Sequence, residues 1–223
     1  MKILGVKLDN LSPEEIIEKI EGFLSGGEQR YLVTPNPEFL VEAQKDQEFK
    51  KILNRAALSV ADGVGLVLAS RFLGRPLPKR LAGVDLMELI CQRAAAKNWP
   101  VCFYGGQEGV AEMAADKLMK RYPGLQVESK NPKVLFVALG ATKQEKWIAA
   151  NLSKLPSVKL ALGVGGAFDF ISGRVRRAPK FVRTAGLEWL WRFLLEPWRA
   201  KRVFRAVAVF PWLVLKEKLS TRK

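Results

Sequence analysis

Short apolar runs alternate with amphipathic helical stretches along residues 1–170, and this alternation constrains the fold more than any other feature. The run KVLFVALG at 133–140 has no polar residue after its first lysine. Strands that are buried on both faces of a parallel sheet have this pattern. We therefore predict an α/β fold: a Rossmann-like three-layer domain with a mostly parallel sheet.

Local signals place the elements along the chain. Ser12 and Glu15 have the spacing of a capping box with Pro13 between them, which predicts the start of a helix. Strands are predicted at 2–7, 30–34, 58–62, 100–106, 126–129, 133–140 and 158–166, with helices in most of the intervals. In such folds, ligands bind beyond the carboxyl ends of the strands.

One junction does not fit this pattern, because only residues 130–132 separate two predicted strands. Neighbouring parallel strands need a crossover of about a dozen residues or more. Either these two strands form a hairpin, or a crossover segment is missing between them.

The C-terminal quarter of the chain differs in charge from the rest. Residues 174–223 carry fourteen Lys and Arg against three acids, which gives +11 of the chain's net +15, and they hold four of the six tryptophans. We predict a Rossmann-like core at 1–185 and a basic, amphipathic helical appendage at 186–223. A basic and aromatic surface of this kind meets phosphate in a membrane, a nucleotide or a nucleic acid.

Composition excludes several kinds of chemistry. The chain has no histidine, which rules out histidine bases and histidine metal ligands. It has no Asp-x-Asp, so no metal is expected at a diphosphate site. Cys91 and Cys102 lie in apolar runs and are interpreted as buried thiols. No apolar run reaches the ~18 residues that a membrane-spanning helix needs.

Polar residues follow several predicted strands. Asp62 ends one strand before a glycine, as either a general base or a helix N-cap. Thr34 and Asn36 end another, where they either bind a polar ligand or form a turn. Gln144 opens a helix after an apolar strand, and Arg80 lies in a basic loop, where a solvated charge is the alternative.

Further candidates are glycines and tail residues. Glycines after strands permit close approach of a ligand or simply close turns. In the tail, arginines spaced by seven and three residues suit fork contacts to phosphate, or form a basic stripe. The candidates for binding a ligand that carries phosphate are Gly105, Gly106, Gly165, Gly166, Arg192, Arg199 and Arg202. The candidates for membrane binding are Trp198, Lys201, Phe204, Arg205, Phe210 and Trp212.

Seven motifs occur in one order along nearly the whole chain. They are Thr34-x-Asn36, Ala61-Asp62-Gly63, Arg80 with Ala82-Gly83-x-Asp85, Leu139-Gly140-x-x-Lys143-Gln144-Glu145-Lys146-Trp147, Gly163-Val164-Gly165-Gly166-x-Phe168-Asp169, Arg177-Ala178-Pro179, and Gly186-Leu187-Glu188-Trp189 followed by Glu196-Pro197-x-Arg199. As an ordered set they resemble the WecG/TagA/CpsF family of bacterial glycosyltransferases. Family members carry a longer stretch at the short 126–132 junction, usually with a further helix.

The resemblance implies an inverting transferase that needs no metal or other cofactor. Such enzymes move an N-acetylmannosamine-type sugar from a UDP donor to N-acetylglucosamine on a polyprenyl diphosphate, and one branch begins wall teichoic acid synthesis. The expected place is the cytoplasmic face of the cell membrane, bound peripherally to anionic lipid. Homo-oligomers are possible, and no nucleic acid partner is expected.

The resemblance also implies roles for individual residues. Asp62 matches the base that deprotonates the acceptor hydroxyl, and Thr34 and Asn36 match contacts near the donor sugar. Arg80 and Gln144 match residues that position substrate. The three tail arginines match those that close over the diphosphate.

Alternative functions remain open from the sequence. The same fold could transfer N-acetylmannosaminuronic acid or another hexose to a surface polysaccharide. A basic chain could also bind nucleic acid, or bind a nucleotide sugar without catalysis.

Overall fold

The computed structural model describes residues 1–77 and 80–220. Its main sheet has five strands, all parallel, in the order β4-β3-β7-β6-β5. The strands are β3 (Arg30–Val33), β4 (Leu58–Ser59), β5 (Val101–Gly105), β6 (Val134–Ala138) and β7 (Leu160–Gly163). This confirms the predicted α/β fold.

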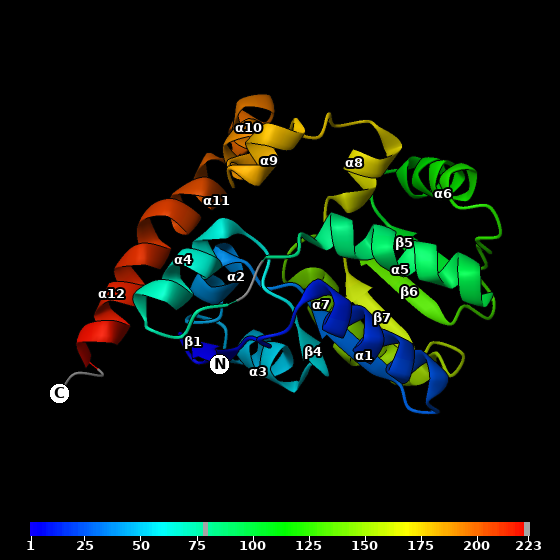
Figure 1. Cartoon of the computed structure of the whole chain (residues 1–223), viewed down its shortest axis with the longest axis horizontal. Coiled ribbons are helices and arrows are strands. Elements are labelled where there is room, and N and C mark those ends of the chain that lie inside the picture. Colours follow the sequence, from blue (N-terminus) through cyan, green and yellow to red (C-terminus); the bar gives the residue numbers. More distant parts are fainter. Residues whose placement is uncertain (78–79, 221–223) are drawn as a thin grey trace.

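Helices cover both faces of the sheet (Figure 1). On one face, α1 (Pro13–Ser25), α5 (Gly83–Lys97), α6 (Val110–Arg121) and α8 (Ala167–Ser172) bury their apolar sides against the strands. On the other face, α7 (Lys143–Asn151) packs on β6 and β7 beside α3 (Gln47–Arg55). A third cluster joins α2 (Pro37–Glu42), α3 and α4 (Val64–Phe72). The predicted capping box is present at the start of α1.

The predicted strand at 2–7 is instead a small hairpin. β1 (Lys2–Ile3) and β2 (Val6–Lys7) pair antiparallel through a two-residue turn. Both turn residues have positive φ, 51° at Leu4 and 74° at Gly5. Tight hairpin turns require this left-handed backbone, and the glycine supplies it at no steric cost.

The short junction at 130–132 is explained by where the two flanking segments lie. The segment at 126–128 makes one parallel bridge, between Val127 and Val101, on the edge of β5 opposite to β6. The bridge is at Val101, the first residue of β5, and Val134 of β6 pairs with that same residue, so residues 128–133 only pass the end of β5 and need no crossover along the sheet. The hairpin alternative is wrong, and no regular strand forms at 126–129.

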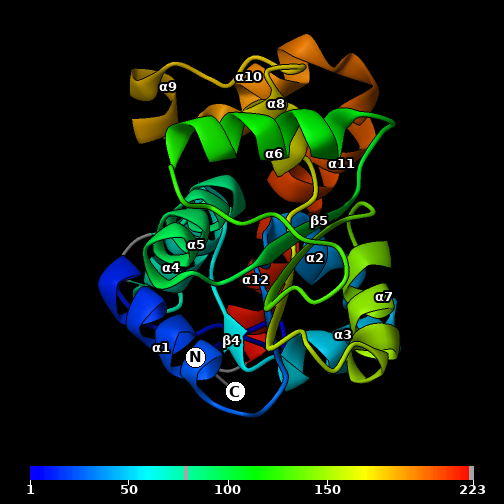
Figure 2. The same ribbon diagram turned by 90° about the vertical axis from the view of Figure 1, so that its right-hand side faces the viewer.

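The C-terminal segment runs along one side of the molecule (Figure 1). It consists of α9 (Lys180–Thr184), α10 (Glu188–Leu195), a 3-10 turn (Pro197–Arg199), α11 (Ala200–Phe204), a π-helical turn (Arg205–Val209) and α12 (Phe210–Ser220). Figure 2 shows α9 and α10 at one end of the molecule, together with α8. Among the described residues, no helix is long and apolar enough to cross a membrane.

The appendage is anchored to the core by buried side chains. Phe210 and Val214 are 2% and 3% exposed and pack in the cluster that contains α2 and α4. The Glu217 carboxylate accepts a hydrogen bond from the Leu4 backbone N–H at 3.1 Å. The expectation that Phe210 binds the membrane is therefore wrong, because its ring faces the protein interior.

Replacing Phe210 with alanine is expected to lower the free energy of unfolding by about 3 kcal/mol or more, since the change leaves a cavity in a packed cluster. Chemical denaturation followed by tryptophan fluorescence measures this loss. The control is Trp212→Ala, because Trp212 is 60% exposed and its removal should change stability far less. Equal losses for the two variants would contradict the anchoring role.

Candidate active site

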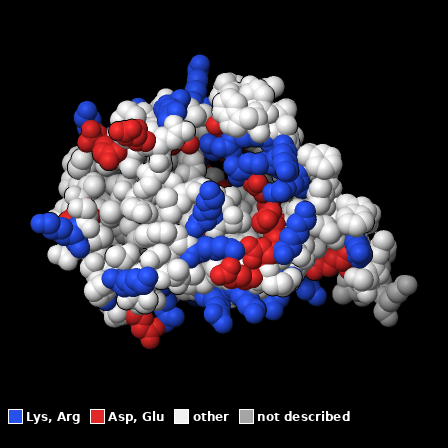
Figure 3. All heavy atoms as spheres, turned by 180° about the vertical axis from the view of Figure 1, so that it is seen from behind, with Lys and Arg blue, Asp and Glu red and all other residues white. Residues whose placement is uncertain are grey.

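A cavity of about 700 Å³ lies beyond the carboxyl ends of the strands. Residues that follow β3, β4, β6 and β7 line its floor, and residues of the appendage line its other side. Figure 3 shows basic side chains gathered beside a hollow on this face of the molecule. The sequence candidates that line the cavity are Thr34, Asn36, Asp62, Arg80, Gly106, Gln144, Gly165, Gly166, Arg192, Arg199 and Arg202.

Asp62 is held at the start of α5. One of its carboxylate oxygens accepts a hydrogen bond from the Gly83 backbone N–H at 3.2 Å. Helix α4 has Gly63 as its N-cap and no side-chain cap, so Asp62 is not the cap of the helix that follows it. A Cβ on Gly83 would lie 3.5 Å from the Thr34 hydroxyl and 3.7 Å from the Asp62 carboxylate, which places these groups together.

The surroundings of Asp62 suit a general base. Burial raises the pKa of its carboxyl to about 6, and the Gly83 hydrogen bond and the positive charge of Arg80 hold the pKa below a still higher value. The negative charges of Glu188 and Asp85 raise it further. A carboxylate with a pKa near 6 is mostly ionised at neutral pH, yet it is a stronger base than an exposed aspartate.

Gln144 is fixed in orientation by two hydrogen bonds. Its side-chain oxygen accepts from the Gly165 N–H at 3.0 Å, and its side-chain nitrogen donates to the Glu145 carboxylate at 2.7 Å. Both side chains lie against Gly163, where a Cβ would collide with them. Gln144 therefore lines the cavity with a side-chain amide whose orientation is fixed.

Glu145 is a residue whose role the sequence did not reveal. It is 1% exposed, and burial raises the pKa of its carboxyl to about 7. Its position directly after Gln144, at the start of a helix, was the available signal. Its carboxylate accepts the hydrogen bond that holds the amide of Gln144 in its orientation.

Three arginines of the appendage reach the cavity. Arg192 contacts Asp169 at 3.5 Å and Glu196 at 2.5 Å, and Arg199 contacts Glu196 at 2.7 Å. Arg202 pairs with Glu38 of α2 at 2.7 Å. A Cβ on Gly166 would collide with the Arg192 guanidinium, so any other residue there would displace this arginine from the β7–α8 turn.

The arginine cluster is suited to bind a further anion. The pKa of Arg199 is lowered, first by burial and then by the positive charges of Arg192 and Arg202. An anion with two or more charges, bound among the three guanidiniums, would relieve this repulsion. Arginines are also the side chains best shaped for bidentate contacts to phosphate.

A second ion-pair network lies beside Asp62. Arg177 contacts Asp85 at 2.7 Å and Glu188 at 3.1 Å. The Arg80 guanidinium donates to the backbone carbonyl of Arg183, so Arg80 is tied to α9. These bonds join the basic turn before α9 to the start of α5. The sequence motifs contained Asp85, Arg177 and Glu188 but gave them no role.

Some candidates lie elsewhere. Gly105 does not line the cavity; a Cβ there would meet the Ala138 carbonyl oxygen at 2.9 Å, so the glycine serves the contact between β5 and β6. Arg205 pairs with Glu42 at 3.0 Å and is only partly exposed.

Asn36 has two roles in the structure. It lines the cavity, and it also caps α2, because its side chain accepts a hydrogen bond from the Phe39 N–H.

Comparison with known proteins gives consistent matches over the whole chain. The family model described as "Glycosyl transferase WecG/TagA/CpsF family" matches residues 1–129 and 126–223, so the match is interrupted at the short junction. Proteins of Staphylococcus aureus strains MRSA252 and NCTC 8325 are each 30% identical to the chain over 241 residues. The alignments cover 99% of this chain and 94% of each relative. Both relatives are named N-acetylglucosaminyldiphosphoundecaprenol N-acetyl-beta-D-mannosaminyltransferase.

Proposed function

The chain belongs to the WecG/TagA/CpsF family of glycosyl transferases, and from that membership we propose that it transfers N-acetylmannosamine from UDP-N-acetylmannosamine to N-acetylglucosamine on a polyprenyl diphosphate. The names of its relatives state this acceptor and this sugar. One observation carries the proposal: a single cavity holds both a desolvated carboxylate and three guanidiniums. Glycosyl transfer from a nucleotide diphosphate needs both kinds of group.

In the proposed reaction, the ionised Asp62 takes the proton of the acceptor hydroxyl. The freed oxygen attacks the anomeric carbon of the donor sugar, and the bond from that carbon to the diphosphate oxygen breaks. UDP leaves with the electron pair, and its charge is stabilised by Arg192, Arg199 and Arg202. A single displacement of this kind inverts the anomeric configuration.

Neutral groups position the sugar in this proposal. Thr34 lies next to Asp62, and the amide of Gln144 is preset by Gly165 and Glu145. Among the described residues, no group of three or more His, Cys, Asp or Glu could hold a metal ion. We propose that the arginines neutralise the diphosphate, and adding EDTA to the assay tests whether a metal is needed.

The identity of the transferred sugar is tested with a set of donors. Three donors are each incubated with a diphospho-N-acetylglucosamine lipid: UDP-N-acetylmannosamine, its uronic acid and UDP-N-acetylglucosamine. The mass of each product is then measured by mass spectrometry. The proposal expects one N-acetylhexosamine to be added from the first donor and much less product from the other two. Preferential addition of the uronic acid would overturn the assignment of the sugar while preserving the reaction class.

We also propose that the appendage binds an anionic membrane surface, as a lipid-linked acceptor requires. Trp198, Phe204 and Trp212 are 76%, 62% and 60% exposed, and Lys201, three residues from both Trp198 and Phe204, is exposed as well. Bulky apolar side chains with nearby cations insert into the headgroup region without spanning the bilayer. The expected location is the inner face of the cell membrane.

Replacing Trp198, Phe204 and Trp212 together with alanine is expected to weaken binding to anionic vesicles by roughly tenfold or more. Vesicle cosedimentation measures this binding. The control replaces Met113 and Met119, which are exposed on α6. Binding that depends on these methionines as strongly, or binding of RNA in place of vesicles, would contradict the proposed membrane surface.

A further inference from the structure

The cavity has two halves of different chemistry. Asp62, Arg80, Gln144 and the appendage arginines line the polar half. The other half lies between α4 and the appendage, where the lining residues that come from α4 and from Val203 onward are all apolar. Its lining residues are Val64, Gly65, Leu68, Val203, Ala206, Val207 and Pro211. We call this half the chain groove.

Two apolar rows form the sides of the chain groove. On α4, Val64 and Leu68 are four residues apart, and on the appendage Val203, Val207 and Pro211 repeat at the same spacing. Leu68 is 58% exposed and Val207 is 47% exposed, so these side chains are not used by the core. Apolar side chains that line a cavity and lack a packing partner indicate an apolar ligand.

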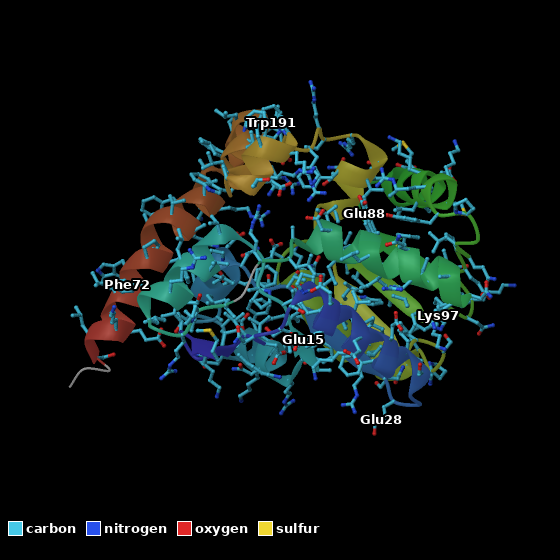
Figure 4. The ribbon with its side chains drawn as sticks, in the orientation of Figure 1. Glu15, Glu28, Phe72, Glu88, Lys97 and Trp191 are labelled. Atoms are coloured by element: carbon cyan, nitrogen blue, oxygen red, sulfur yellow. The ribbon has the colours of Figure 1, made fainter. Side chains whose placement is uncertain are left out.

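Beyond the chain groove, α4 and α12 carry further exposed apolar side chains. Phe72 follows Leu68 by one more turn of α4 and is 45% exposed; Figure 4 shows it on the side of α4 that faces α12. The Lys218 ammonium lies 3.8 Å from the centre of the Phe72 ring, which joins the two helices there. On α12, Leu215 is 46% exposed. From Val64 to Phe72 the helix extends about 12 Å at ~1.5 Å per residue.

The arrangement of the two halves matches the order of the three parts of a lipid-linked acceptor, which are sugar, diphosphate and hydrocarbon chain. Its sugar would lie at Asp62 and its diphosphate near the arginines. Arg202, which pairs with Glu38, stands where the polar half meets Val203 of the chain groove. A hydrocarbon chain attached to that diphosphate would enter the apolar half directly, without burying a charge.

Building on the proposed function, we propose that the chain groove between α4 and the appendage binds the first isoprene units of a polyisoprenyl diphosphate acceptor. The groove thereby selects the acceptor through its chain as well as through its sugar. Membrane contact by the exposed aromatic residues is a separate contribution, because those residues do not line the cavity.

The test uses water-soluble acceptors without any membrane. Diphospho-N-acetylglucosamine is prepared with either a geranyl or a methyl group, and kcat/KM is measured for each. The wild-type chain is expected to favour the geranyl acceptor by roughly tenfold or more, since burial of apolar carbons drives the difference. In the double variant L68Q and V207Q this preference should fall to near one. The control is L194Q, because Leu194 is 67% exposed on α10 and does not line the cavity.

The outcomes separate this proposal from the proposed function. Turnover of both acceptors at equal kcat/KM by the wild-type chain would refute the chain groove while keeping the transferase. A geranyl preference that survives in the double variant would also refute it, as would a preference lost equally in L194Q. Absence of turnover with either acceptor, in a chain that still binds UDP, would refute the proposed function itself.

Discussion

Replacing Asp62 with asparagine is expected to lower turnover about 10²–10⁴-fold, the range that a general base contributes. The asparagine oxygen can still accept the hydrogen bond from the Gly83 N–H, so the local fold should persist. UDP binding should stay nearly unchanged, because the arginines that face the diphosphate are untouched. Steady-state kinetics and calorimetric UDP titration together measure both effects.

The pH dependence of kcat/KM is a second test of Asp62 as the base. Since Asp62 acts in its ionised form and its pKa is raised to about 6, kcat/KM should fall as pH decreases through about 6. The control is Asp85→Asn, which removes a nearby carboxylate outside the cavity. It should leave turnover within about tenfold and move the acidic limb to lower pH. Full activity of the Asp62 variant would exclude this residue as the base.

Replacing Arg192 with alanine is expected to lower kcat by about 10²–10³-fold, as loss of a group that stabilises a developing anion does. This guanidinium joins the appendage to the cavity, because it contacts Asp169 at 3.5 Å and lies 4.7 Å from the centre of the Phe170 ring. The Arg192→Lys variant should be intermediate, since lysine keeps the charge but loses the planar fork. The measurement is single-turnover kinetics at saturating donor.

Arg176→Ala is the matched control for the loss of charge. Arg176 is exposed and does not line the cavity, so its removal should change kcat by less than about threefold. If both alanine variants lost activity equally, the effect would come from the overall positive charge and not from the position of Arg192.

The elements with strong local signals were predictable from the sequence. Ser12 and Glu15 define the start of α1 with two hydrogen bonds between residues only three apart in the sequence. The β6 strand is buried on both faces, so every one of its residues is apolar. The candidate site followed from topology, because residues after parallel strands meet at one edge of the sheet.

The remaining features depended on contacts between distant parts of the chain. Phe210 has the same local pattern as its exposed neighbour Trp212, and only the packing of α12 against α2 and α4 distinguishes them. The short segment at 126–128 needs no crossover because it pairs only with the first residue of β5, which no local pattern indicates. The contact between Gln144 and Glu145 at the start of α7 depends on the space left by Gly163 on β7.

The most direct test of the account is UDP release by the purified chain with UDP-N-acetylmannosamine and a short-chain diphospho-N-acetylglucosamine lipid, in the presence of EDTA. UDP release is expected to require both substrates and to continue in EDTA. Release that stops in EDTA would contradict neutralisation of the diphosphate by the arginines alone. No release at all, with UDP still bound, would contradict the proposed transfer.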